Sequence, residues 1–256
     1  MATKPGIKGN IHSAQHHDSA AKHVSGQAVY VDDINMPNHG LVVLIGQSPH
    51  AHALIRGMDL TAVAAAPGVL RVMTAEDVPG FNDCSPVAHD DPIFAVEKVS
   101  YVGQSVFAVV AENMTAARAA LPLAHIDYDP LPAILTIDAA MEASSFHGPP
   151  AQMKKGEPDK HLASASRKLS GRLYCGGQEH FYLEGQAALA IPGEDGDIQL
   201  YASTQHPSEI QHKVAEMLGV SSHAVTVETR RMGGAFGGKE SQGNLPALTA
   251  ALAAHL

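Results

Sequence analysis

The first half of the chain alternates apolar runs with short polar breaks. Residues 41–45 and 69–74 are short apolar runs of the kind that buried strands show, and residues 105–111 form a longer run. A short helix is predicted over residues 116–121, and the alternating polarity of residues 125–129 predicts a half-buried strand. This succession of strand, helix and strand predicts one αβ layer in which the helix covers the sheet.

The second half begins with a predicted hairpin and helix. Residues 186–191 and 198–203 alternate in polarity, and the turn between them contains Gly193 and Gly196, which are free to adopt positive φ. Pro207 then occupies a first helical position. The apolar residues that follow recur at the spacing of one buried helix face and are Ile210, Val214, Met217 and Leu218.

The last stretch predicts a strand, a loop and a helix. Residues 225–230 alternate in polarity and run directly into the glycine-rich residues 232–240. Residues 245–256 are rich in alanine and leucine and predict a helix. Because this helix lacks a Gly, Asn or Pro stop signal, we expect the chain to be truncated at Leu256, with its apolar stripe buried by later residues or by another chain. A frayed natural terminus is the alternative.

Composition divides the chain into two domains. Residues 142–162 are rich in Gly, Pro, Lys and Ser, show little periodicity and predict a linker. We therefore expect a flexible arm over residues 1–16, an αβ domain over residues 17–141 and the first part of a second domain over residues 163–256. The predicted fold class is α+β, with a small αβ domain followed by the start of a large mixed α/β domain.

Charge and composition exclude several partners. Acidic residues outnumber basic ones by 26 to 17, and the formal charge of -9 offers no general attraction to nucleic acid or to an anionic membrane. No stretch is apolar enough for a membrane span or a secretory signal, and Cys84 and Cys175 stand far apart. We expect a cytoplasmic protein that has neither nucleic acid nor a membrane as a partner.

A glycine cluster marks the loop that carries the candidate chemistry. Gly233, Gly234, Gly237 and Gly238 remove β-carbons where the backbone comes close to another group. A glycine loop between a strand and a helix also favours an anionic ligand. The sequence completes neither of two nucleotide-binding patterns, the phosphate-binding loop and the dinucleotide-binding pattern. Glu240 stands where a phosphate-binding loop has Ser or Thr, and the spacing Gly-x-Gly-x-x-Gly is missing.

Several stretches of the sequence resemble one family. Residues 230–241, Arg-Arg-Met-Gly-Gly-Ala-Phe-Gly-Gly-Lys-Glu-Ser, resemble the glycine loop of the xanthine dehydrogenase and aldehyde oxidase family of molybdenum hydroxylases. Other stretches look like the same family and together extend the resemblance over nearly the whole chain: residues 17–33, 101–104, 128–132, 177–184 and 202–207. The resemblance implies the N-terminal part of a molybdopterin-binding subunit, with a hammerhead-like αβ domain before the start of the cofactor domain.

The resemblance also assigns roles to particular residues. Gln205 looks like the glutamine whose side-chain amide hydrogen-bonds to an oxygen ligand of molybdenum, and Phe236 and Gly237 look like residues that offer main-chain contacts to the cofactor. Glu240 resembles the carboxylate that orients a purine substrate. The family holds the metal through the pterin dithiolene, so no side chain of this sequence is expected to ligate molybdenum directly. Ala235 stands where the family usually has a third glycine.

Each of these residues also has an interpretation without a ligand. Glu240 would be a dipole partner at the start of the last helix. Gln205 would satisfy backbone donors of the loop, and Phe236 would be a core aromatic. Ala235 would be strained if the loop needs positive φ there. The positions of these side chains decide between the interpretations.

The function that the resemblance implies is hydroxylation of purines, from hypoxanthine and xanthine to urate, by a multi-subunit enzyme with a molybdenum–molybdopterin cofactor. Two isolated cysteines cannot hold even a two-iron cluster, so iron–sulfur clusters and FAD are expected on a partner chain. The catalytic base is expected in a C-terminal remainder beyond Leu256, and the chain alone is expected to be inactive. The alternatives are an aldehyde or azaheterocycle hydroxylase of the same family, and a non-catalytic binding or assembly module.

Overall fold

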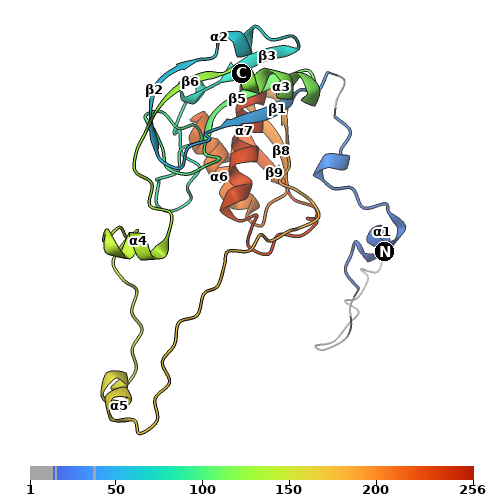
Figure 1. Ribbon diagram of the computed structural model, residues 1–256. Helices are drawn as coiled ribbons and strands as arrows, with labels where there is room; N and C mark the ends of the chain where they lie inside the picture. The colour runs from blue at the N-terminus through green and yellow to red at the C-terminus, as the bar shows by residue number, and fades with distance from the viewer. Residues whose placement is uncertain (1–13, 15, 37–38) are drawn as a thin grey trace.

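Figure 1 shows the computed structural model, which describes residues 14, 16–36 and 39–256. The first half of the chain forms two small sheets. One of them packs against a third sheet and two longer helices from the C-terminal part, and the other packs on its opposite side. Helices and sheets are mixed in this way in α+β proteins, which confirms the predicted fold class. Apart from Ala14 and His16, the arm predicted over residues 1–16 lies outside the described residues.

The helices and strands have the following bounds. The helices are α1 (Ala20–Ser25), α2 (Thr61–Ala64), α3 (Met114–Ala120), α4 (Ile137–Glu142), α5 (Pro158–Ser164), α6 (Pro207–Leu218) and α7 (Asn244–His255). The strands are β1 (Val42–Gln47), β2 (Ala53–Asp59), β3 (Val69–Met73), β4 (Lys98–Val99), β5 (Ser105–Ala111), β6 (His125–Pro130), β7 (Ala188–Pro192), β8 (Ile198–Ala202) and β9 (Val225–Glu228). The strands predicted from apolar runs and from alternating polarity are thus confirmed.

Strand β5 is the centre of the first sheet. The sheet has the order β1-β5-β3, and β5 is antiparallel to both neighbours. Every residue of β5 is buried, as its unbroken apolar sequence predicts. Helix α3 packs against β1 and β5, and the Asn113 side chain caps it by accepting a hydrogen bond from the Ala116 N–H at 2.9 Å.

The prediction of a single αβ layer is wrong in one respect. Strand β6 does not join β5; it pairs with β2 in a second sheet of order β4-β2-β6. The physical reason is that β1 and β3 already occupy both edges of β5, so its backbone has no free hydrogen-bonding edge for another strand. The alternating polarity of β6 indicates a half-buried strand but does not indicate its partner.

The C-terminal part is built on the predicted hairpin. Strand β8 pairs antiparallel with β7 and parallel with β9. In the turn Gly196 has φ 86°, as predicted, whereas Gly193 has φ -100° and Asp195 takes the second left-handed position at φ 55°. Helix α6 begins at Pro207 and ends before Gly219, whose φ is 68°, and its predicted apolar face is buried. Helices α6 and α7 pack against each other and against this sheet.

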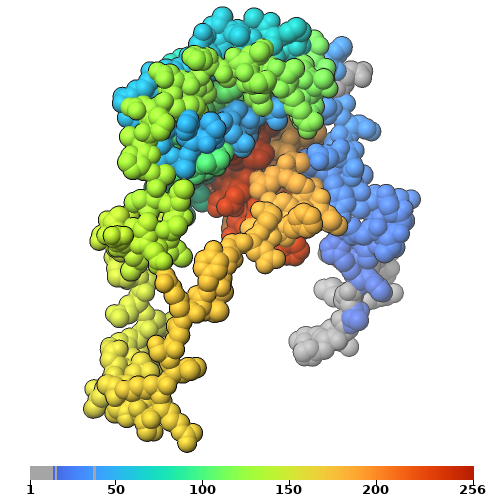
Figure 2. Space-filling model, in the orientation of Figure 1, coloured from blue at the N-terminus to red at the C-terminus, as the bar shows by residue number. Residues whose placement is uncertain are grey.

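A long excursion separates the two parts of the chain. Residues 134–187 contain only the short helices α4 and α5, and Figures 1 and 2 show this segment extending away from the rest of the molecule. The linker predicted over residues 142–162 falls within this segment, and the domain boundaries stay predictions. Among the described residues, none of the helices combines the length and the apolar character that crossing a membrane requires.

The two parts share one hydrophobic core and a buried ion pair. The cluster of buried side chains around β8, α6 and α7 also contains residues of the first part: Met73, Cys84, Ile93, Phe94, Ala108 and Val110. Lys213 Nζ of α6 lies 2.8 Å from Asp83 Oδ2 and 3.0 Å from Glu216 Oε2. Burial alone would lower the pKa of Lys213, but these two carboxylates raise it, so the ammonium stays charged although its side chain is only 5% exposed.

Removing this ammonium tests how strongly the two parts are joined. We expect Lys213→Met to lower the free energy of unfolding by about 3 kcal/mol, because breaking a buried pair strands the remaining charge. Urea denaturation of the purified protein measures this change. Arg56→Met is the matched control, since the side chains of the Arg56–Asp129 pair are 56% and 50% exposed and such a pair contributes at most about 1 kcal/mol. Equal effects of the two substitutions would contradict the prediction.

Candidate functional site

The glycine loop connects β9 to the last helix. Strand β9 ends at Glu228, and residues 229–240 follow as an irregular loop. A 3₁₀ turn at Ser241–Gly243 then leads into α7, which begins at Asn244. The predicted order of strand, glycine loop and helix is present, with a short turn inserted before the helix.

Three of the loop glycines are required because residues 180–184 pack against them. A β-carbon at Gly233 would lie 2.4 Å from Glu184 Cβ, and one at Gly234 would lie 2.9 Å from Tyr182 Cβ. At Gly238 a β-carbon would lie 2.7 Å from Tyr182 Cε1. Such distances are shorter than any van der Waals contact, so a side chain cannot be accommodated at these positions. Here the backbone comes close to another segment of the same chain.

Gly237 and Phe236, in contrast, face open space. A β-carbon at Gly237 would have no atom within 4 Å, and Gly237 has φ 90°. Phe236 is 75% exposed and has φ 53°, a left-handed conformation that costs a bulky residue about 1–2 kcal/mol. The interpretation of Phe236 as a core aromatic is therefore wrong. Backbone strain beside an open surface is typical of ligand sites.

The strain considered for Ala235 is absent. Ala235 is buried, has no positive φ and accepts a hydrogen bond from the Gly238 N–H at 2.7 Å in a tight turn. The left-handed positions of the loop are Gly234, Phe236 and Gly237. Alanine at position 235 is thus compatible with the loop conformation, and the strained non-glycine residue is its neighbour.

The Gln205 side chain binds the loop through its carbonyl oxygen. Oε1 accepts hydrogen bonds from the backbone N–H groups of Gly237 at 3.1 Å and Lys239 at 3.3 Å. The Gln205 N–H adds a third contact by donating to the Lys239 C=O at 2.9 Å. Gln205 therefore fills the role that requires no ligand, which is to satisfy backbone donors of the loop. The Nε2 amide group makes no hydrogen bond to a described residue, so both of its protons remain available to a ligand.

Glu184 forms the centre of a polar network beneath the loop. Its Oε2 accepts hydrogen bonds from the Gly233 N–H at 2.7 Å, from Ser203 Oγ at 2.7 Å and from Lys239 Nζ at 3.1 Å. Burial alone would raise the pKa of this carboxyl, but the three donors lower it below its usual value of 4.5. Glu184 is consequently charged at neutral pH although its side chain is only 8% exposed.

Lys239 completes this network from the loop. Its side chain is 0% exposed, and Nζ donates to Ser203 Oγ at 2.8 Å as well as to Glu184. The same Nζ lies 4.7 Å from the centroid of the Tyr182 ring, a cation–π contact. Lys239 therefore points into the protein and binds a carboxylate of its own chain.

Glu240 lies on the exposed side of the loop. The 3₁₀ turn separates it from α7, so Glu240 is not in the first turn of that helix, and its interpretation as a dipole partner of α7 is wrong. Its Oε1 lies 3.6 Å from His206 Nε2, and Nδ1 of the same imidazole lies 3.7 Å from Glu209 Oε2. About half of the Glu240 side chain is exposed, and it remains accessible to a ligand.

The site also includes Glu184, Ser203 and Lys239, which the sequence motifs do not single out. All three lie in stretches that carry the family resemblance, but a motif does not reveal which of its side chains are buried or paired. The sequence feature that could have indicated an ion pair is the opposite charge of two motif residues. Lys239 follows directly after the last loop glycine, and Glu184 ends another motif. Neither position indicates the other as its partner.

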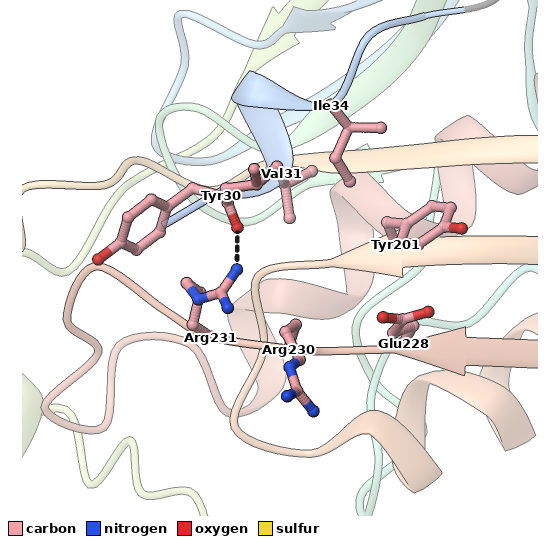
Figure 3. A pocket seen from close by; sticks show the side chains of 8 residues that line it. Tyr30, Val31, Ile34, Tyr201, Glu228, Arg230 and Arg231 are labelled. Carbon is pink, nitrogen blue, oxygen red and sulfur yellow. Dashed lines mark hydrogen bonds between the residues drawn. The ribbon is translucent and has the colours of Figure 1, made fainter. Parts of the chain in front are cut away.

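Arg230 and Arg231 make a different contact, with the N-terminal segment. Arg231 Nη1 donates to the Val29 C=O at 2.6 Å (Figure 3). Arg230 Nη2 lies 3.4 Å from Asp18 Oδ2. A cavity of about 210 Å³ beside this contact is lined by Val29, Tyr30, Val31, Ile34, Tyr201, Glu228, Arg230 and Arg231. None of the site residues predicted from the sequence lines this cavity, so the two sites are separate.

Gln205→Ala removes the carbonyl oxygen that holds two loop amides. We expect the Gly237 and Lys239 N–H groups to exchange with solvent about tenfold faster, the result of losing one net hydrogen bond of about 1.4 kcal/mol. Hydrogen–deuterium exchange of the purified protein measures this. Gln205→Glu is the matched control, because it keeps an acceptor oxygen and loses only the Nε2 donor; its exchange should stay near that of the wild type. Equal acceleration in both variants would contradict the role of Oε1.

Protonation of Glu184 is expected to weaken the network in acid. Because its pKa in the folded protein lies below the usual 4.5, the carboxylate stabilises the fold fully above pH 4.5, and this contribution is lost as the pH falls through the folded-state pKa. The wild type should therefore exceed Glu184→Gln in free energy of unfolding by a constant amount near neutral pH. The excess should shrink below pH 4.5 in urea titrations. An excess that does not change with pH would exclude a contribution from the Glu184 charge.

Comparisons with known proteins match both parts of the chain. Residues 25–132 match the family described as "Aldehyde oxidase and xanthine dehydrogenase, a/b hammerhead domain", and residues 142–256 match the "Molybdopterin cofactor-binding domain". Xanthine dehydrogenase/oxidase of Mus musculus is 41% identical over 240 residues, which cover 93% of this chain and 18% of that protein. Aldehyde oxidase 1 of Bos taurus is 40% identical over 238 residues, which cover 91% of this chain and 18% of that protein.

A solved structure agrees with these matches. The aldehyde oxidoreductase from Desulfovibrio gigas is similar with a TM-score of 0.79 and 26% identity, over 93% of this chain and 29% of that one. The chain spans 18% of the length of each of the two curated relatives, the Mus musculus and the Bos taurus proteins. The hammerhead domain precedes the cofactor-binding domain, in the order that the motifs imply. The chain belongs to the xanthine dehydrogenase and aldehyde oxidase family of molybdenum hydroxylases.

Proposed function

We propose that this chain is the N-terminal part of the molybdenum subunit of a hydroxylase that oxidises the purines hypoxanthine and xanthine to urate. The observation that carries the proposal is the Gln205 side chain. Its carbonyl oxygen is used by the loop, which leaves the Nε2 donor free beside the open face of Gly237. A neutral donor held in this way can orient an oxygen ligand of a metal without competing for the metal itself.

The residues around the glycine loop fit a metal that is held by a pterin. Gly237 leaves space where a β-carbon would stand, and the backbone of Phe236 is strained and exposed. These features offer main-chain contacts to a cofactor. When bound, the molybdenum–molybdopterin group supplies the centre for oxygen transfer and accepts the electrons that leave the substrate.

Glu240 supports a purine as the substrate. Its carboxylate lies on the exposed side of the loop, directly after the buried Lys239, and can accept hydrogen bonds from purine N–H groups. The His206 imidazole, 3.6 Å away, limits the orientations that the carboxylate adopts. We propose that Glu240 orients the purine while Gln205, Phe236 and Gly237 contact the cofactor.

The proposal requires parts that this chain does not supply. Cys84 is buried and Cys175 is exposed, and two separate thiols cannot hold an iron–sulfur cluster. We propose that the clusters and FAD lie on a partner chain and that the catalytic base lies in a C-terminal remainder, in a cytoplasmic enzyme. The named relatives, of which this chain spans 18%, support the need for further domains and leave a single longer polypeptide as the alternative arrangement.

Aldehydes are the second candidate substrate class. Aldehyde oxidase 1 of Bos taurus is 40% identical to this chain, and xanthine dehydrogenase/oxidase of Mus musculus is 41% identical. This difference is too small to separate the two classes. An acid at position 240 favours the purine, because a carboxylate pairs with the N–H groups of a purine, which a simple aldehyde lacks.

Glu240→Ala in the full-length complex tests the substrate class. We expect kcat/KM for xanthine and hypoxanthine to fall about 10–100-fold, the effect of losing a hydrogen bond to a charged group of roughly 1.5–3 kcal/mol. Molybdenum and pterin contents should stay at the wild-type level. Glu142→Ala, which removes an exposed carboxylate on α4, is the control and should change neither measurement.

Two results would overturn the purine assignment. One is undiminished purine turnover in Glu240→Ala, and the other is a wild-type enzyme that oxidises aldehydes but not purines. Absence of molybdenum from the wild-type complex would overturn the proposed function as a whole.

A further inference from the structure

We propose that Glu184 and Lys239 are positioning residues for cofactor binding. Their buried ion pair holds the glycine loop against the segment of Gln205, so that the open face of Gly237 and the free Gln205 amide are presented to one ligand. This inference rests on the proposed function and extends it to two residues that lie beneath the site and have no surface on it.

The first step is that one carboxylate joins both ends of the glycine run. Glu184 Oε2 accepts the Gly233 N–H at the start of the run and Lys239 Nζ directly after its end. The Glu184 N–H also donates to the Gly233 C=O at 3.3 Å. With both ends held, few conformations remain for the residues between them, and the strained φ of Phe236 persists because its surroundings impose it.

The second step is that the backbone of Lys239 connects this pair to Gln205. The Lys239 C=O accepts the Gln205 N–H at 2.9 Å, and the Lys239 N–H donates to Gln205 Oε1 at 3.3 Å. Ser203, two residues before Gln205, donates to Glu184 and accepts from Lys239 Nζ. The loop and the Gln205 segment are therefore bound to the same pair.

A purely structural role is the alternative, and single substitutions do not separate it from positioning. Removing one charge leaves the other buried without its partner, which destabilises the fold whatever the function. The double variant Glu184→Gln/Lys239→Met avoids this, because it leaves no unpaired charge and the amide oxygen at position 184 still accepts the Gly233 N–H. If the pair is only structural, the double substitution restores the stability of the fold. If the pair positions the loop, the loop still lacks the ammonium that holds it.

The test uses the full-length complex and four measurements: the thermal midpoint, molybdenum and pterin content, hydrogen–deuterium exchange over residues 233–240, and the electron paramagnetic resonance signal of bound molybdenum after partial reduction to Mo(V). For the double variant we expect a thermal midpoint near that of the wild type, molybdenum content lowered about 10-fold or more, and exchange at Gly237 and Lys239 about 10-fold faster. The resonance signal of the remaining molybdenum should shift, since the Gln205 amide is no longer held in place.

A second variant keeps the proposal testable should the double variant fold poorly. Ser203→Ala removes one hydrogen bond to Glu184 and one from Lys239 without burying an unpaired charge. We expect loop exchange about threefold faster and molybdenum content lowered to a similar extent. The matched control is Asp83→Asn/Lys213→Met, which removes a second buried lysine pair in the described part of the chain and should leave loop exchange and molybdenum content unchanged.

The outcomes distinguish the two proposals. The positioning role would be overturned if loop exchange stayed at the wild-type rate in both Glu184→Gln/Lys239→Met and Ser203→Ala. It would also be overturned if exchange became faster while the molybdenum content and the resonance signal stayed at their wild-type values. Loss of molybdenum in the Asp83→Asn/Lys213→Met control as well would also overturn it, because the loss would then follow any buried-pair exchange. A wild-type complex without molybdenum would overturn the proposed function instead. Hydrogen exchange compared between the cofactor-free wild type and the cofactor-free variants still tests whether the pair holds the loop.

Discussion

The buried pair of Glu184 and Lys239 is the interaction on which the candidate site depends. Two charges taken out of water cost more than their mutual attraction returns unless each finds a nearly complete set of partners. Here the ammonium has a carboxylate, a hydroxyl and an aromatic ring, and the carboxylate oxygen Oε2 has three donors, while Oε1 is buried without a partner among the described residues. The observed conformation of the loop supplies all of these partners together. The pair therefore specifies the loop conformation, whatever its net contribution to stability.

The same residues make structural contacts on one side and offer contacts to a ligand on the other. Gly233, Gly234 and Gly238 make room for residues 180–184, and Gly237 alone of the four has an open face. Gln205 binds the loop with its carbonyl oxygen and keeps its amide group free. The interpretations with and without a ligand are therefore not exclusive for Gln205. A side chain fixed at one end by the protein loses less entropy when it binds at the other end, which favours a precisely oriented contact.

The first part of the chain contributes to the site indirectly, by holding α6. Helix α6 begins directly after His206, and its last turn is bound by the first part through the Gly80 N–H, which donates to the Met217 C=O at 2.7 Å. The shared core adds to this contact. The segment that carries Gln205 and His206 thus has a rigid helix on one side and the Lys239 backbone on the other. This arrangement explains physically why the hammerhead part and the cofactor-binding part pack as one body.

Local sequence was sufficient for the strands, the hairpin, helix α6 and the family, because polarity patterns, turn residues and motifs act over a few neighbouring positions. It was also sufficient to select Gln205 and Gly237, which the fold joins by a hydrogen bond. It could not show that β6 pairs with β2, that the loop glycines face residues 180–184, or that Lys239 is buried against Glu184, 55 positions away. Those features depend on which edges and charges meet once the chain is folded, and a residue pattern carries no information about a distant partner.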